Sequence, residues 1–336
     1  MANNFSRRRF AQLAGAGAAF SLFPRIVTAA DPIVLKFSHV VTNDTPKGKG
    51  ALRFKNLAEK YTAGRVKVEV YPNSSLYKDK EELEALQLGT VQILAPATSK
   101  FAPLGVKEFE ALDLPFVFKD DADYNKATKG EVGQFLLNKL PAKNVRGLAF
   151  WDNGFHMMSA NKPLLHSSDF EGLKVRTDGS KVSAHYFHLL GAVPQVLAFS
   201  EVYQALQTGV VDGTQNTPSN YLTQKFYEVQ KDITVSNHAH LQYAVIVNDK
   251  YWASLPADIR TQVEKAMAEA TDYSNSIAQK ENADALEEMK KSGKTTFHKL
   301  TPAETKDWVD KMHPTYTWAE GRVGKEILAL LAKPRN

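Results

Sequence analysis

The stretch that most constrains the fold runs from Gly172 to Asn216, because it alternates strand and helix signals. A predicted strand ends at Arg176, and Ser180 is a favourable N-cap for a helix that stops at Gly191. A second strand, a second helix and a third extended segment follow before Asn216. Strands that alternate with helices predict a parallel sheet, and ligands of such sheets bind beyond the carboxyl ends of the strands.

The first part of the chain repeats this order. Strand patterns at 33–40, 66–70 and 91–94 are separated by helical patterns, the second of them at 80–88. Residues 84–91 also resemble residues 204–211 at the same helix-to-strand junction. We therefore expect two lobes of like topology, with a cleft between them in which a small ligand binds.

A long helical pattern extends from Pro256 to about Lys291, without glycine or a further proline. At 1.5 Å per residue it would reach about 50 Å, more than one small lobe needs, so we predict that it lies across both lobes. The predicted fold class is α/β with two lobes, each of them a mixed, mostly parallel sheet flanked by helices. The predicted boundaries are 31–153 plus 242–285 for lobe I and 154–241 plus 286–336 for lobe II.

Residues 1–30 have the pattern of an export signal. Ser6-Arg7-Arg8-Arg9-Phe10 precedes a short apolar run, and small residues follow near Ala30. The paired arginines indicate a twin-arginine signal, and an ordinary secretory signal would lead to the same compartment. The run is too short for a permanent membrane anchor, so the expected location is the periplasm of a Gram-negative bacterium, with no stable membrane insertion.

Composition and motifs exclude several other classes. The chain has no cysteine, which removes disulfides, thiolate metal sites and a lipid anchor, and its net charge of +5 comes from lysines spread along the sequence, which disfavours nucleic-acid binding. No G-x-S-x-G, H-E-x-x-H or phosphate-binding loop is present. The histidine pairs 185/188 and 238/240 lack a third ligand at useful spacing. We expect no catalysis, no metal and no cofactor.

Arg176 is the candidate with the clearest chemistry. It lies among apolar residues at the end of a predicted strand, where an unpaired guanidinium would be costly to bury. A bidentate carboxylate would satisfy it. That carboxylate could belong to a ligand or to an acidic side chain of the protein, and position alone leaves both alternatives open.

A family resemblance bears on this choice. The run 172–216, with its segment FSEVYQALQTGVVDG, and the motifs SHVV, TPKG, YPNSSL, WDNGF and FYEVQK resemble the solute-binding subunits of tripartite ATP-independent periplasmic (TRAP) transporters, and most closely the C4-dicarboxylate binders. The resemblance covers essentially all of the chain after the predicted signal. It implies a two-lobed periplasmic binding protein fold that closes over an organic acid, a long helix bridging the lobes, and delivery of the acid to a membrane permease.

The resemblance also implies roles for individual residues. Arg176 matches the arginine that pairs with the ligand carboxylate, Asn216 a ligand-bonding asparagine, and Phe199 an aromatic residue packed on the ligand. The further matches near the cleft are His39, Lys47, Ser99, Lys100, Trp151 and Asn153. Two positions depart from the family pattern: His156 replaces a usual lysine or arginine, and Gln215 replaces a common glutamate.

These residues predict a monomeric binding protein for malate, succinate or fumarate. Longer dicarboxylates, 2-oxo acids and aromatic acids are alternative ligands, and a ligand-presenting module for a membrane sensor or a secreted hydrolase are alternative functions. If His156, with an ordinary pKa near 6.5, meets a second carboxylate, dicarboxylate affinity should strengthen as the pH falls from 8 toward 6.

Overall fold

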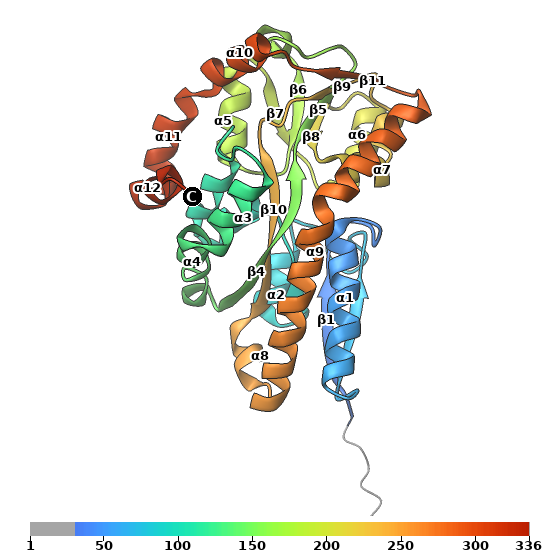
Figure 1. The fold of residues 1–336 in the computed structure, drawn as a ribbon, viewed down its shortest axis with the longest axis vertical. Coiled ribbons are helices and arrows are strands. Elements are labelled where there is room, and N and C mark those ends of the chain that lie inside the picture. Colours follow the sequence, from blue (N-terminus) through green and yellow to red (C-terminus); the bar gives the residue numbers. More distant parts are fainter. Residues whose placement is uncertain (1–30, 336) are drawn as a thin grey trace, which may run out of the picture. The chain divides into compact units, whose positions relative to one another are not determined.

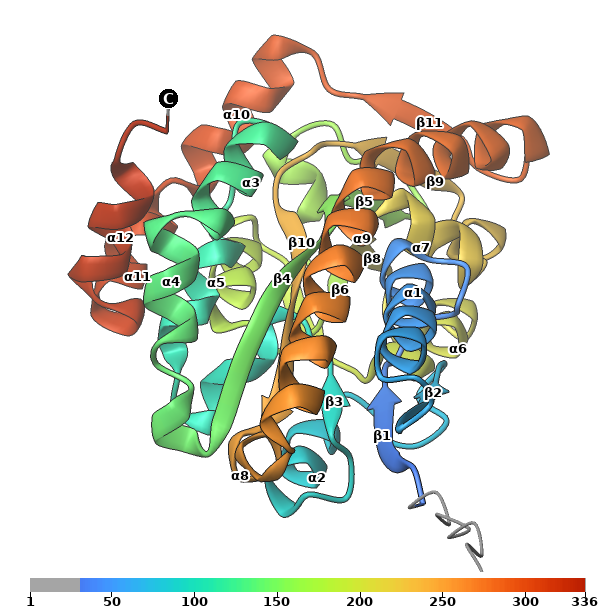
Figure 2. The same cartoon turned by 60° about the horizontal axis from the view of Figure 1, so that its bottom comes forward.

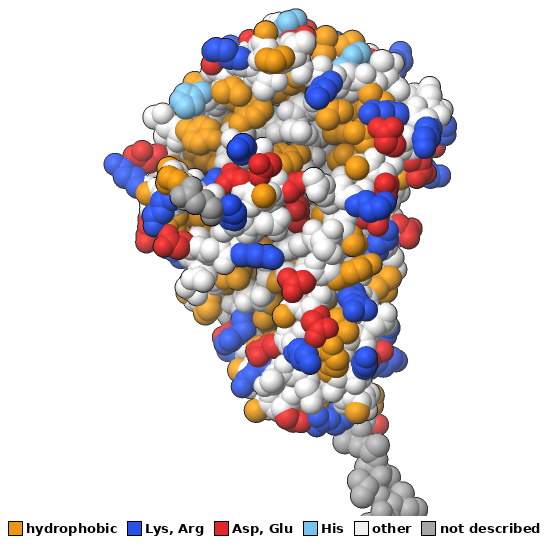
Figure 3. Space-filling view, in the orientation of Figure 1, with side chains coloured by type: hydrophobic (Ala, Val, Ile, Leu, Met, Phe, Trp, Pro, Cys, Tyr) orange, Lys and Arg blue, Asp and Glu red, His pale blue; other side chains and the backbone are white. Residues whose placement is uncertain are grey.

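The structure is a computed structural model that describes residues 31–335. The predicted export signal lies outside the described residues. From Pro32 onward the chain forms one compact unit built on two sheets. On the face drawn in Figure 3, basic and acidic side chains are interspersed.

The first sheet has five strands in the order β2-β1-β3-β10-β4. Their bounds are β1 (Ile33–Ser38), β2 (Val66–Tyr71), β3 (Ile93–Leu94), β4 (Val145–Phe155) and β10 (His240–Asn248). β1 pairs in parallel with β2 and β3, whereas β10 is antiparallel to β3 and β4. This sheet and the helices packed on it form lobe I.

The second sheet has six strands in the order β11-β9-β5-β8-β6-β7 and forms lobe II with its helices. Their bounds are β5 (Met157–Ala160), β6 (Lys174–Thr177), β7 (Val193–Val196), β8 (Gly213–Asn216), β9 (Asp232–Val235) and β11 (Thr296–Lys299). β6 is parallel to β7 and β8, and β5 is antiparallel to β8 and β9. The two-lobed α/β fold is confirmed.

The stretch from 172 to 216 alternates as predicted, through β6, α5 (Lys181–Leu189), β7, α6 (Val202–Gln207) and β8. Ser180 accepts a hydrogen bond from the Ser183 backbone N–H as the N-cap of α5. The second strand of this stretch, β7, ends at Val196. Phe199 begins a single 3₁₀ turn, η5 (Phe199–Glu201), in which the Glu201 carboxylate accepts from the Ala198 backbone N–H at 3.3 Å. The turn places Phe199 beyond the strand ends.

The long helix α9 (Ala257–Ser292) packs against α1 (Pro46–Tyr61) of lobe I and α7 (Pro218–Thr223) of lobe II (Figure 1). Val263 lies in the core of lobe I, and Met289 lies in the core of lobe II. The predicted helix that spans both lobes is therefore confirmed. Within residues 31–335, no helix combines the length and apolar character that a membrane span requires.

The C-terminal segment crosses the molecule through α10 (Pro302–Met312), α11 (Pro314–Val323) and α12 (Lys325–Ala332) (Figures 1 and 2). α10 packs on α5 of lobe II, whereas α12 packs on α4 (Glu131–Leu137) in the same hydrophobic cluster as lobe I residues. Beyond α12, Arg335 Nη2 donates to Asp123 Oδ2 at 2.9 Å. The predicted boundaries grouped this segment with lobe II; we propose that α12 belongs with lobe I.

The remaining helices are short and complete the two lobes. They are α2 (Glu82–Leu88), α3 (Asp121–Lys129), α8 (Asp249–Ser254) and the 3₁₀ segments η1 (Thr98–Leu104), η2 (Lys107–Asp113), η3 (Pro141–Lys143), η4 (Ser167–Phe170) and η6 (Phe226–Glu228). The segments η1 and η2 lie between β3 and α3.

Two strands carry the chain from one sheet to the other. β4 of lobe I continues through His156 into β5 of lobe II, and β10 begins beside it, where His240 pairs with Phe155. Asn282 of α9 fastens this crossing, because its Nδ2 donates to Asn153 O at 2.8 Å and its Oδ1 accepts from the Ser219 backbone N–H at 2.9 Å. The crossing strands therefore connect the two lobes.

Candidate functional site

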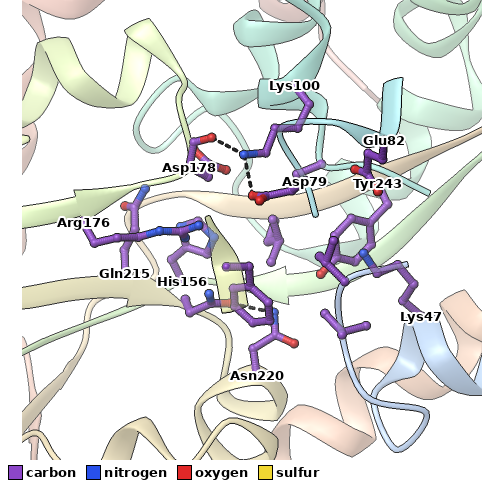
Figure 4. A pocket seen from close by; sticks show the side chains of 16 residues that line it. Lys47, Asp79, Glu82, Lys100, His156, Arg176, Asp178, Gln215, Asn220 and Tyr243 are labelled. Atoms are coloured by element: carbon purple, nitrogen blue, oxygen red, sulfur yellow. Dashed lines mark hydrogen bonds and ion pairs between the residues drawn. The ribbon is translucent and has the colours of Figure 1, made fainter. Parts of the chain in front are cut away.

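A pocket lies between the two sheets, and residues of both lobes line it (Figure 4). Six predicted site residues are among the lining: Lys47, Lys100, His156, Arg176, Phe199 and Asn216. The other lining residues are Val40, Val41, Asp79, Glu82, Ala97, Asp178, Gln215, Asn220, Leu241 and Tyr243. In Figure 4, Arg176, His156 and Gln215 lie on one side of the pocket, and Lys47, Glu82 and Tyr243 lie on the other.

Arg176 is held rigidly but not neutralised. Its side chain is buried, with 4 % of the residue exposed, and its Nε and Nη2 donate to Leu197 O at 3.2 and 2.9 Å. The guanidinium carbon lies 5.9 Å from the centroid of the Phe199 ring. Within residues 31–335, no carboxylate oxygen lies within the 4.0 Å of an ion pair with this guanidinium. The alternative of an internal salt bridge is therefore not what the structure shows.

Asn216 adds a second donor at the end of β8. Its Oδ1 accepts from the Thr217 backbone N–H at 2.9 Å and from Asn220 Nδ2 at 2.7 Å. Because both bonds use the amide oxygen, the amide N–H groups of Asn216 remain available to the pocket. Arg176 and Asn216 together present donors to one small volume, which suits an anionic oxygen.

His156 differs from the expectation based on its ordinary pKa. It is 7 % exposed, and burial lowers its pKa to about 4, although the Asp178 carboxylate acts in the opposite direction. Its Nδ1 makes no hydrogen bond with a described residue. His156 is thus neutral at physiological pH in this state, so it meets a ligand as a polar group rather than as a cation.

The lobe I side of the pocket holds a buried pair of opposite charges. Lys47 Nζ donates to Ala95 O at 3.1 Å and lies 3.6 Å from the centroid of the Tyr243 ring. Burial lowers the pKa of Lys47 to about 7 against the opposing effect of Glu82, and burial raises the pKa of Glu82 to about 7 against the effect of Lys47. Both groups therefore change charge most easily near neutral pH.

Lys100, which lines the pocket, and its neighbour Ser99 connect the two lobes. Lys100 Nζ pairs with Asp79 at 2.8 Å and also donates to Asp178 O, while Ser99 Oγ donates to Asp178 Oδ2 at 2.8 Å. Burial alone would raise the pKa of Asp178, but Lys100 and Arg176 outweigh it and hold the pKa below its usual range. Asp178 of lobe II thus accepts from two side chains of lobe I, from Ser99 through its ionised carboxylate and from Lys100 through its backbone carbonyl.

Similarity to known proteins identifies the family. The family described as "Bacterial extracellular solute-binding protein, family 7" matches residues 37–321. The "C4-dicarboxylate-binding periplasmic protein DctP" of Rhodobacter capsulatus is 60% identical over 324 residues, which cover 96% of this chain and 97% of that protein. The chain belongs to solute-binding protein family 7.

Solved structures of TRAP periplasmic solute-binding proteins have the same fold. A TRAP periplasmic solute-binding protein from Shewanella oneidensis with bound succinate superposes with a TM-score of 0.87 at 44% identity, covering 89% of this chain and 98% of that one. A TRAP solute-binding protein from Pseudomonas aeruginosa PAO1 with bound L-malate gives a TM-score of 0.83 at 40% identity, covering 85% and 99%. The predicted family is confirmed.

Four residues carried over from the family resemblance lie outside the pocket lining. Trp151 is buried in the core of lobe I, where its Nε1 donates to Thr271 Oγ1 at 2.8 Å. Asn153 Nδ2 donates to Thr217 Oγ1 at 2.7 Å across the strand crossing. His39 is fully buried, and burial lowers its pKa to about 3. Ser99 is the fourth predicted residue that is not among those lining the pocket.

Several lining residues were missed by sequence reasoning. Asp178 follows Arg176 at the same strand end with the same parity, a signal that could have placed both beside the ligand. Tyr243 is a polar-tipped residue within the apolar strand β10. Asp79 and Glu82 lie at the start of the short helix α2, where acidic residues are ordinary dipole partners, so no local signal marks them.

Another cluster of ionisable groups lies at the strand crossing, outside the pocket lining, with Asp152 and His240 buried and Asp121 half-buried. Asp121, Asp152 and His240 bring ligand atoms within 4.8 Å of one another, an arrangement that could hold a metal ion. However, His240 Nε2 lies 3.2 Å from Asp152 Oδ1. Burial alone would lower the pKa of His240, but Asp152, aided by Asp121, raises it to about 9. Protonated His240 therefore forms an ion pair with Asp152, and this ion pair accounts for the close approach of the three side chains.

Proposed function

We propose that this family 7 protein is the periplasmic solute-binding subunit of a TRAP transporter and captures a C4-dicarboxylate such as succinate, malate or fumarate. The observation that carries the proposal is the buried Arg176, which has no carboxylate partner among the described residues and shares the pocket with Asn216. Its relatives support this ligand class. One is named as a C4-dicarboxylate-binding protein, and two solved structures contain bound succinate or L-malate.

Capture follows from the donors in the pocket. A ligand carboxylate pairs with Arg176 and accepts from Asn216, and Phe199 packs on the ligand beside the guanidinium. Lys47, on the opposite side, meets the distal end. The ligand stabilises the closed arrangement because it contacts both lobes at once, and no covalent step is involved.

Export and delivery belong to the same proposal. The twin-arginine-type segment at residues 1–30 directs the chain to the periplasm, the location named for its relative DctP. The loaded protein then docks transiently, as a monomer, with the membrane subunits of its permease. Uptake of labelled succinate by cells that carry these subunits, with and without this protein, tests the partnership.

A thermal-shift screen over organic acids tests the ligand. A ligand that binds only the folded state raises the unfolding midpoint by mass action, so C4-dicarboxylates should give the largest shifts. Longer dicarboxylates, 2-oxo acids or aromatic acids at the top of the ranking would move the proposal to that class. Calorimetric titration with recovery of unchanged ligand separates capture from hydrolysis, and turnover would contradict the proposal.

A further inference from the structure

Gln215 lines the pocket beside Arg176, and its amide group is fixed by two neighbours. It is 5 % exposed at the end of β8. Its Oε1 lies 2.7 Å from Tyr186 OH and 2.7 Å from His238 Nε2. Gln215 Nε2 has no hydrogen bond of ordinary geometry to a described residue, although the amide also interacts with the side chain of His156. The amide oxygen thus accepts from two protein donors, and the amide nitrogen keeps an N–H group for the pocket.

Both neighbours are able to donate. Tyr186 is fully buried, and burial raises the pKa of its hydroxyl, which therefore keeps its proton. Burial, together with His156, lowers the pKa of His238 well below its ordinary value, so this imidazole is neutral and carries one N–H. Its Nδ1 lies 2.7 Å from Ser236 Oγ.

One arrangement of hydrogens satisfies every member of this network. The Ser236 hydroxyl donates to His238 Nδ1, which leaves the ring proton on Nε2. His238 Nε2–H and Tyr186 O–H then both donate to Gln215 Oε1. The reverse orientation would point the Gln215 oxygen toward the ligand that Arg176 is placed to bind, where an acceptor would oppose an anion.

We infer that Gln215 is a specificity-determining residue that donates its amide N–H groups to the ligand carboxylate held by Arg176. This inference rests on the proposed function. Tyr186 and the pair Ser236–His238 are positioning residues that keep the donor side of the amide in the pocket. The site therefore selects a ligand group that accepts hydrogen bonds at this point and disfavours one that can only donate.

A glutamate at this position, as the family pattern commonly has, would reverse the selection. One carboxylate oxygen would take the two bonds from Tyr186 and His238, and the other would present a charged acceptor to the pocket. Two carboxylates side by side repel each other, so such a site would suit a ligand with a hydroxyl or another donor there. Glutamine and glutamate have nearly the same shape, so this change alters the charge and the hydrogen-bonding groups of the site but not its size.

The test is the isosteric variant Gln215→Glu, titrated calorimetrically with succinate. At pH 8 we expect binding to be at least about 30-fold weaker than in the parent protein, because like charges meet in a buried site. Gln279→Glu adds the same charge at an exposed position of α9 and is the matched control, with unchanged affinity expected. Unchanged affinity in Gln215→Glu would overturn the inference.

The pH profile separates this role from a damaged fold. A protonated glutamic acid again combines one acceptor oxygen with one donor, so the ratio of variant to parent dissociation constants should fall toward one as the pH falls from 8 to 5.5. His156, His238, Arg176 and Asp178 surround the position in both proteins, and the ratio cancels the protonation of the ligand. A large ratio that does not change with pH would contradict the inference.

Tyr186→Phe tests the positioning network. Removing one of the two donors should weaken succinate binding about 2- to 10-fold. The same change in a Gln215→Ala background should have no further effect, because Tyr186 then has no amide to orient. Equal effects in both backgrounds would assign Tyr186 a purely structural role. If the parent protein binds no C4-dicarboxylate, the proposed function fails; if the parent binds and only these variants deviate from expectation, this inference fails alone.

Discussion

Arg176 combines complete burial with donors that the protein uses only in part. Leu197 O orients the guanidinium, while no described carboxylate neutralises it. A ligand carboxylate would therefore complete a buried charge pair, and the affinity should depend strongly on this residue.

Arg176→Ala should weaken succinate binding by about 2 to 5 kcal/mol, the usual penalty for removing one partner of a buried charge pair. Arg176→Lys should recover part of that loss, since it restores the charge without the bidentate geometry. Calorimetric titration measures both. An alanine variant with parental affinity would rule out the carboxylate pair.

Succinate affinity should strengthen as the pH falls from 8 to 6.5, but through Glu82 and Lys47 rather than through His156. Proton uptake removes the charge of Glu82 or adds charge to Lys47, and either change makes the lining more positive. Glu82→Gln should flatten the profile, because Lys47 then loses the carboxylate that favours its charged form. His156→Gln should keep the slope, since burial already lowers the His156 pKa to about 4. The opposite ranking of the two slopes would restore the original hypothesis for His156.

Arg176 could be predicted from its position at the end of a strand, whereas Asn216 and Phe199 were predicted only from the family resemblance of the same stretch. It could not reveal the burial that neutralises His156 or brings Lys47 and Glu82 together, because those pKa shifts depend on the packing of segments distant in the chain. The protonation states of these side chains could therefore be inferred only from the structure.

At the scale of elements, strand and helix order was predictable where periodicity is strong, as in Val66–Tyr71 and the long helix α9. Boundaries shifted where a local hydrogen bond competes with the strand, as at Phe199. The pairing of β10 between β3 and β4 was not predictable, because antiparallel insertion of a late strand leaves no local signature.

The strand crossing should contribute a pH-dependent term to stability. His240 has an ordinary unfolded pKa near 6.5 and a folded pKa of about 9, so its pairing with Asp152 stabilises the protein fully below pH 6.5 and is lost as the pH rises through 9. The unfolding free energy of the ligand-free protein should fall by at most about 3 kcal/mol over this range. Chemical denaturation at several pH values measures it.

His240→Gln should flatten this dependence, and His188→Gln, at an exposed position of α5, should leave it unchanged. The same slope in the His240 variant and the parent protein would show that another group carries the effect.

For the whole molecule, the lobes meet through Ser99, Lys100 and Asp178, of which Lys100 and Asp178 line the pocket. We expect these contacts to hold the closed, ligand-bound state. Ser99→Ala removes a hydrogen bond to a charged acceptor, so succinate should dissociate about 10-fold faster with little change in the association rate. Stopped-flow kinetics measures both, with the exposed Ser276→Ala as control. Faster association with unchanged dissociation would exclude this role.

The two-lobed arrangement was predictable from the repeated element order, but the return of α12 to lobe I was not. Apolar residues such as Ile327 and Leu331 can pack on many hydrophobic surfaces, and the sequence does not indicate which one. In the structure, α12 packs on α4.

That return has a practical consequence. The described chain begins with β1 in lobe I, and Arg335 is fastened to Asp123 of the same lobe. An affinity tag or surface linker placed next to β1 or Arg335 is therefore attached to lobe I alone and does not restrict the movement of lobe II relative to lobe I. Immobilised protein should retain its response to ligand, and a fluorescent reporter of that motion needs its second dye on an exposed position of lobe II, such as Val210.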